Sequence, residues 1–215
     1  QTSSRPLVLA LLGAFVALGP LTIDLYLPGL PNIEADLGTT ASAVQFTLTG
    51  TLIGLALGQL VVGPLSDALG RRGPLFFGTG VHVLASILGF VAPSIAFLGA
   101  ARVLQGAGAA ATAVVTMAVV RDLYSGRAAA LLISRLMLVL GVAPVLAPTI
   151  GGFVLGVPDW LPLATREGSV ARRILRVLAL PIVALVITDA ILLASHVPPV
   201  VDGLRRTQAG SFLID

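Results

Sequence analysis

A few ionisable side chains lie inside long apolar stretches of this 215-residue sequence, and these side chains could do chemistry. A charge inside an apolar helix is costly, so it is a functional candidate by default. Asp24 could carry a proton or attract a cation, or it could simply be solvated near a helix end. Arg102 lies deeper in its stretch. The others are His82, Arg135, Arg176 and Asp189.

These other residues can also be explained without a functional role, for reasons that differ from one residue to the next. We expect His82 to be a packing residue rather than a proton relay, because it stands alone on an apolar helix. Arg135 and Arg176 lie near the ends of their stretches and can extend to the polar surface. Asp189 is either an inward-facing functional acid or part of a locally irregular segment.

The composition is that of a membrane protein. Hydrophobic residues make up 56% of the chain and charged residues 11%, with a mean hydropathy of +1.01. A small soluble domain exposes too much surface to hide so much apolar side chain, and disordered chains are polar. The 13 basic residues are all arginines scattered between apolar runs, which argues against nucleic acid as a partner. Without cysteine, disulfides and thiolate catalysis are excluded.

Six apolar segments could each cross a bilayer, which takes about 20 mostly apolar residues in a helix. The expected fold is an all-α membrane protein, a six-transmembrane-helix bundle over residues 1–200. Residues 201–215 would form a cytoplasmic tail or the start of a central loop. The spans are Leu7–Leu30, Val44–Leu65, Pro74–Ala92, Ser94–Val120, Ala128–Leu155 and Ile174–Val197.

Arginines in the short loops predict the orientation. The loops after the second and fourth spans carry arginines, whereas residues 31–43 after the first span carry acids and no arginine. Both termini are therefore expected in the cytoplasm. Residues 159–173 disagree, because this loop should lie outside and yet contains three arginines, Arg166, Arg172 and Arg173.

Four sequence patterns follow one another within the first five spans. The turn after the second span reads G-P-L-S-D-A-L-G-R-R from Gly63, and the fourth span contains R-V-L-Q-G-A-G-A-A from Arg102. The fifth span contains G-V-A-P-V-L-A-P-T-I-G-G from Gly141, and the first ends D-L-Y-L-P-G-L-P from Asp24. In the turn, an acid at a helix end with two arginines beyond it suits charge pairing across the bundle.

Taken together, these patterns resemble the N-terminal six-helix half of a major facilitator superfamily transporter, in the Bcr/CflA-type drug/proton antiporter branch. The turn departs from the family pattern at Ala68, where the family usually has arginine. The resemblance implies a secondary active transporter that exports small drugs or metabolites in exchange for protons across a bacterial inner membrane. It implies no cofactor and no enzymatic activity, and the sequence offers no metal site.

The resemblance also implies roles for individual residues. Proton coupling would involve Asp24, Arg102 and Gln105. A cytoplasmic gate would comprise Gly63, Asp67, Gly70, Arg71, Arg72 and Arg121, and we hypothesise that Asp67 pairs with Arg121. The antiporter motif on the fifth span would comprise Gly141, Pro144, Pro148, Gly151 and Gly152.

Other functions receive less support from the residues. A membrane-embedded hydrolase needs a serine and a histidine within hydrogen-bond reach, but Ser195 and His196 are adjacent and point to different helix faces. ATP-driven export is not supported, because the nucleotide-binding pattern G-x-x-x-x-G-K-[ST] requires a lysine and the chain has none. A half-length subunit or truncated product that does not transport, and only associates with other membrane helices, stays open.

The six spans are half of the twelve that the resemblance implies, so a second six-helix half is an expected partner. We expect the natural product to be longer than this chain. An immunoblot against residues 31–43 should then show a band at about twice the 21.9 kDa of this chain. A band at 21.9 kDa would instead mean that the half-length chain exists as such.

Overall fold

The structure is a computed structural model that describes residues 4–156 of the chain, and within this range it is helical without strands. The predicted span Ile174–Val197, the tail 201–215, Arg176 and Asp189 lie outside the described residues. The elements are α1 (Ser4–Asp24), the 3₁₀ helix η1 (Leu27–Gly29), α2 (Leu30–Asp36), α3 (Ala41–Leu69), α4 (Arg72–Phe90), α5 (Ile95–Leu123) and α6 (Gly126–Gly156).

Five helical segments of the described part are long and apolar enough to cross a membrane. This confirms the expected all-α membrane fold over residues 4–156. Each of the first five predicted spans falls on one of these segments, with helix ends that differ from the predicted ones by a few residues. For example, α3 covers Ala41–Leu69 where Val44–Leu65 was expected.

The first span is not one continuous helix as predicted. The α1 helix ends at Asp24, and η1 and α2 follow within what was expected to be the rest of the span and the next loop. Pro28 accounts for the break, because its ring would clash with the carbonyl of residue 24 and it has no N–H to donate. Pro28 and Pro31 each occupy a first-turn position of the new short helices, where a proline is tolerated.

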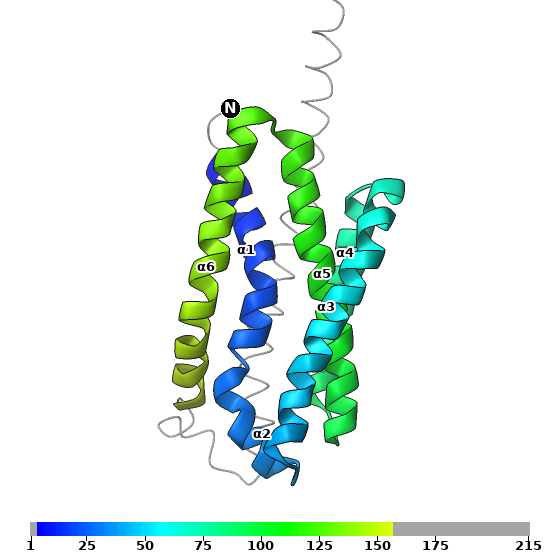
Figure 1. Ribbon diagram of the computed structural model, residues 1–215, viewed down its shortest axis with the longest axis vertical. Helices are drawn as coiled ribbons and strands as arrows, with labels where there is room; N and C mark the ends of the chain where they lie inside the picture. Colours follow the sequence, from blue (N-terminus) through cyan, green and yellow to red (C-terminus); the bar gives the residue numbers. More distant parts are fainter. Residues whose placement is uncertain (1–3, 157–215) are drawn as a thin grey trace, which may run out of the picture.

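The α5 helix is the centre of the described bundle. It packs against α3, α4 and α1, and α1 packs in turn against α6. Figure 1 shows α1 lying between α6 and α5, with α3 crossing α5. The start of α1 and the α3–α4 and α5–α6 connections lie at one end of the bundle, and α2 lies at the other.

Glycines allow α5 to approach its neighbours so closely. A Cβ built at Gly106 would collide with the Thr51 carbonyl of α3, and one built at Gly54 would collide with the Val103 carbonyl of α5. On the other side, a Cβ at Gly78 of α4 would collide with Ala111. Such small-residue contacts drive helix association in lipid, where burial of apolar surface adds little.

The helix ends have local causes. Thr40 and Ser94 cap α3 and α5, because each side-chain oxygen accepts from a backbone N–H three residues on, at 3.3 Å. Gly70 follows α3 with a φ of 81°, in the left-handed region that glycine adopts without strain. The chain can therefore turn directly from α3 into α4.

Large apolar side chains remain exposed along α3 and α6. Phe46 and Leu60 of α3 are 72% and 73% exposed, and Val145 of α6 is 71% exposed. Such faces are costly in water, so lipid or other helices must cover them. This exposure fits an integral multi-pass membrane protein.

The glycine contacts generate a test on a single helix. Gly78→Ala should lower Tm by about 2–10 °C, because overpacking typically costs about 1–3 kcal/mol. The matched control is Gly80→Ala on the same helix, where an added Cβ would have no neighbour within 4 Å. Thermal stability in detergent, followed by size-exclusion chromatography after heating, measures both. Equal Tm values would contradict the packing described here.

Candidate functional site

Arg102 lies inside the helix bundle. It is on α5, and only 7% of its surface is exposed. A buried guanidinium needs acceptors for its N–H groups, because leaving a charge without partners in a low-dielectric interior is very costly. Three groups surround it: the Thr22 carbonyl of α1, the ring of Tyr26 just before η1, and the Gln105 amide of α5.

The first acceptor exists because α1 is broken. The last carbonyls of a helix have no partner within the helix, and α1 ends at Asp24. Arg102 Nη1 donates to the Thr22 carbonyl at 3.3 Å. The C-terminal end of a helix is also the negative end of its dipole, which favours a cation there. The break at Pro28 thus prepares a binding position for the arginine.

Tyr26 covers the guanidinium. The Arg102 Cζ atom lies 3.5 Å from the centroid of the Tyr26 ring, and a cation over an aromatic face is stabilised by about 2 kcal/mol when desolvated. The ring is held in turn, because the Tyr26 hydroxyl lies 3.0 Å from Thr47 Oγ1 on α3. This cation–π contact joins α5, α3 and the segment that follows α1.

Gln105 supplies the third contact, one turn along α5. Arg102 Nη1 donates to Gln105 Oε1 at 2.8 Å, which is the contact that an i,i+3 spacing allows. The amide nitrogen of Gln105 donates to Ser86 Oγ on α4 at 2.8 Å. Arg102 and Gln105 therefore form one polar unit that is tied to α1 and α4.

Asp24 is half-buried and lies at the end of α1. In residues 4–156 it has no recorded hydrogen bond or ion pair, and no carboxylate pairs with Arg102. Arg102 nevertheless contacts residues on both sides of it in sequence, Thr22 and Tyr26. The acid and the arginine thus belong to the same end of α1 without being paired.

A second charged cluster lies at the α3–α4 turn. The Arg71 guanidinium donates to both carboxylate oxygens of Asp122, at the end of α5, at 2.7 and 3.3 Å. It also pairs with Asp67 and donates to the buried Ser66 Oγ at 2.8 Å. The hydrogen bonds to Asp122 and Asp67 raise the pKa of Arg71, so it stays charged. Arg71 therefore ties the end of α3 and the start of α4 to α5.

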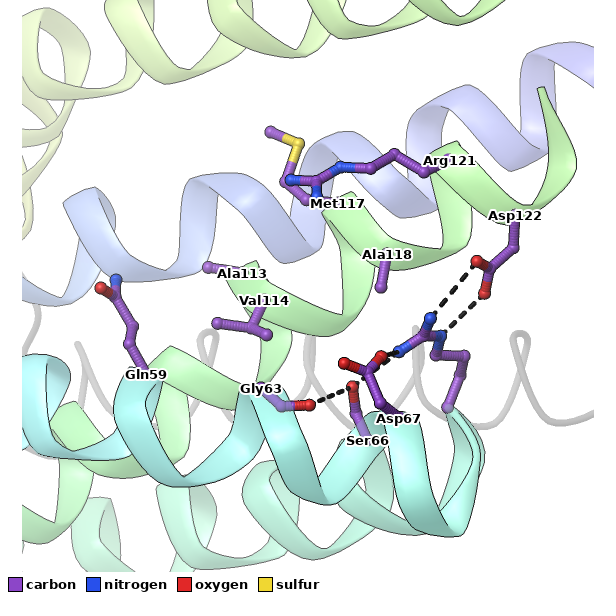
Figure 2. A pocket seen from close by; sticks show the side chains of 11 residues that line it. Gln59, Gly63, Ser66, Asp67, Ala113, Val114, Met117, Ala118, Arg121 and Asp122 are labelled. Atoms are coloured by element: carbon purple, nitrogen blue, oxygen red, sulfur yellow. Dashed lines mark hydrogen bonds and ion pairs between the residues drawn. The ribbon is translucent and has the colours of Figure 1, made fainter. Parts of the chain in front are cut away.

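This cluster forms part of the lining of a cavity of about 420 Å³ between α3 and α5. Figure 2 shows Gln59, Gly63, Ser66 and Asp67 on one side and residues of α5 on the other. The hypothesised pairing of Asp67 with Arg121 is wrong, because Asp67 pairs with Arg71. The Arg121 side chain extends alongside Met117, away from Asp67 (Figure 2). Consecutive residues of a helix point about 100° apart. Because Asp122 faces Arg71, the neighbouring Arg121 points in a different direction, away from Asp67.

The motif predicted on the fifth span lies on α6, with Pro144 and Pro148 inside the helix. Its glycines differ in surroundings. A Cβ at Gly151 would approach the Leu25 carbonyl to 2.7 Å, whereas Gly141 and Gly152 have nothing within 4 Å of such an atom. Gly151 therefore lets α6 pack against the broken end of α1, beside Tyr26.

Sequence reasoning missed several residues of these clusters. Asp122 was overlooked beside Arg121, although it is an acid in the last turn of a helix that faces an arginine-rich turn. Tyr26 was seen only as part of a pattern, and Ser86 carried no signal in the sequence. Among residues 4–156, no group of three His, Cys, Asp or Glu side chains could hold a metal ion.

Comparison with known proteins assigns the family. The model of the Major Facilitator Superfamily matches residues 9–165. This chain belongs to that superfamily. It is 48% identical over 158 residues to the uncharacterized MFS-type transporter YdgK of Bacillus subtilis, which covers 73% of this chain and 39% of YdgK. The predicted resemblance to this superfamily is confirmed.

Two further relatives are named for drug resistance. The chain is 43% identical over 147 residues to the chloramphenicol resistance protein of Pseudomonas aeruginosa, which covers 67% of this chain and 35% of that protein. It is 34% identical over 160 residues to a bicyclomycin resistance protein homolog of Haemophilus influenzae, with 74% and 40% covered. As a member of a transporter superfamily, the chain is not an enzyme.

A solved structure shows the same fold. The human organic anion transporter MFSD10 (TETRAN) superposes with a TM-score of 0.58 at 20% sequence identity, covering 88% of this chain and 48% of MFSD10. The major facilitator chain described here thus spans about 35–40% of the length of the relatives it matches.

The Arg71 pairing can be tested by a double-mutant cycle. Arg71→Gln and Asp122→Asn should each lower stability, and together by less than the sum, with a coupling of about 0.2–1 kcal/mol for a partly exposed pair. The control cycle uses Asp67→Asn and Arg121→Gln, for which no coupling is expected. Thermal unfolding in detergent measures both cycles, and coupling only in the second would refute the pairing.

Proposed function

We propose that the protein containing this chain exports small, mostly hydrophobic drugs or metabolites in exchange for protons. The observation that carries this proposal is the buried Arg102, held at the broken end of α1, where neither it nor Asp24 has an ion-pair partner within residues 4–156. The names of two relatives, which refer to resistance to chloramphenicol and bicyclomycin, support drugs as the substrate class.

The chemistry of exchange follows from these groups. Asp24 can take up a proton when it is exposed on one side of the membrane and lose it on the other. A nearby positive charge favours the ionised carboxylate, so movement of Asp24 relative to Arg102 changes its proton affinity. A proton and a substrate that compete for this end of α1 would be exchanged, one for the other.

Alternating access requires two bodies that rock against each other. We propose that a second six-helix half covers the apolar faces of α3 and α6, including Phe46 and Val145, with the substrate path between the halves. The Arg71 cluster would act as the cytoplasmic gate, since it joins α3, α4 and α5 at the arginine-rich end. Gly63, Gly70, Arg72 and Arg121 lie at the same end.

The arginines at one end of the bundle indicate how the protein is oriented in its membrane. We propose that the protein lies in the bacterial inner membrane. The start of α1 and the arginine-bearing α3–α4 and α5–α6 turns share one end of the bundle (Figure 1). By the positive-inside rule, we propose that this end, and with it the N-terminus, faces the cytoplasm.

The role of Arg102 can be tested in proteoliposomes that contain the transport-competent protein. Arg102→Ala should reduce chloramphenicol uptake driven by an imposed proton gradient at least about tenfold, equivalent to about 1.4 kcal/mol. Arg127→Ala, at the exposed start of α6, is the matched control and should leave uptake unchanged. Full gradient-driven uptake by Arg102→Ala would remove the proposed role.

Asp24 is tested by separating exchange from driven transport. Asp24→Asn stays permanently neutral, so we expect it to lose gradient-driven uptake while retaining exchange of labelled for unlabelled chloramphenicol without a gradient. Glu34→Gln, an acid on α2 outside the cluster, should retain both. If Asp24→Asn keeps driven uptake, another group carries the proton.

A further inference from the structure

We infer that His82 and Ser86 of α4 are positioning residues that hold the Arg102–Gln105 pair in one hydrogen-bonded arrangement. This inference rests on the proposed coupling role of Arg102. Three side chains form a directed chain of hydrogen bonds, in which Arg102 donates to Gln105, Gln105 donates to Ser86, and Ser86 donates to the backbone carbonyl of His82.

His82 is fully buried, and its ring donates across the helix interface. Its Nδ1 atom lies 2.9 Å from the Gln105 carbonyl oxygen. A carbonyl only accepts, so the proton must be on Nδ1. The Nε2 atom is buried without a partner in residues 4–156. The neutral Nδ1–H imidazole therefore fits this position, since a protonated ring would bury a second N–H without an acceptor.

Ser86 determines which way the Gln105 amide points. Its hydroxyl proton is used, because Oγ donates to the His82 carbonyl at 2.8 Å. Its lone pairs are therefore available, and Gln105 Nε2 donates to them at 2.8 Å. The other end of the amide, Oε1, must then face Arg102, where it accepts at 2.8 Å. Serine thus selects the rotamer that places an acceptor beside the guanidinium.

Loss of either α4 residue acts on Arg102 at a distance. Without the Ser86 acceptor, the Nε2 end of the Gln105 amide loses its contact, and only the hydrogen bond from Arg102 still orients the amide. Without the His82 bond, the Gln105 backbone loses its tie to α4. The close approach of Gly108 to the His82 backbone keeps α4 and α5 near enough for both bonds.

Transport assays separate positioning from simple packing. In proteoliposomes, the ratio of gradient-driven chloramphenicol uptake to gradient-free exchange reports on coupling. We expect Ser86→Ala and His82→Phe to lower this ratio at least about fivefold. Ser86→Thr and His82→Asn, which keep the hydroxyl and a donor near the Nδ1 position, should restore it.

The matched control is Thr79→Val on α4. Thr79 is buried like Ser86, but its hydroxyl has no hydrogen-bond partner in the described part of the chain. This variant should keep the wild-type ratio. An equal fall in Thr79→Val, or an unchanged ratio in both Ser86→Ala and His82→Phe, would overturn the inference.

Arg102→Ala in the same assay distinguishes the two levels of the proposal. If Arg102→Ala keeps the wild-type ratio, the proposed function fails and the positioning role fails with it. If Arg102→Ala uncouples transport while the Ser86 and His82 variants do not, only the positioning role fails.

The histidine tautomer gives a readout that needs no transport. Nitrogen NMR of the protein labelled with ¹⁵N-histidine, with the signal assigned by its loss in His82→Asn, should show a protonated Nδ1 and an unprotonated Nε2. The NMR measurement does not need the His82→Phe variant. If that variant fails to fold, Ser86→Ala can still be used in the transport test. The opposite tautomer in the wild-type protein would overturn the inference.

Discussion

The buried guanidinium of Arg102 is the constraint on which the centre of this structure depends. A positive charge with 7% exposure requires acceptors on every side, and the fold supplies them from three elements. The break in α1 frees the Thr22 carbonyl, Tyr26 offers its ring face, and Gln105 contributes its amide oxygen. Pro28, which ends α1, therefore allows the fold to accommodate the buried arginine.

Close helix packing is the second requirement, and the glycines meet it. Because Gly54, Gly78 and Gly106 bring α3, α4 and α5 almost into backbone contact, short polar side chains can bridge the helices. Ser86 reaches Gln105 only at this separation. The same small residues that stabilise the bundle in lipid thus bring together the polar network around Arg102.

The two charged clusters share a rigid element. Asp122 follows Arg102 by twenty positions on α5, about 30 Å along the helix axis. One cluster ties α5 to the broken end of α1, and the other ties it to the α3–α4 turn. The two clusters are therefore joined through one helix, so the proposed exchange site and the proposed gate can be linked without contact between them.

The sequence by itself determined the membrane class, the first five helices, the superfamily and the i,i+3 pair Arg102 and Gln105, because these depend on local hydropathy and on short spacings along one helix. Tertiary structure alone decided the partners across helices. Asp67 pairs with Arg71 and not with Arg121, since the rotation of α5 turns Asp122 toward the α3–α4 turn. Tyr26 and Ser86 join the Arg102 network only because α1 breaks and α4 approaches α5. Such contacts depend on helix rotation and separation, which no spacing along a single chain segment encodes.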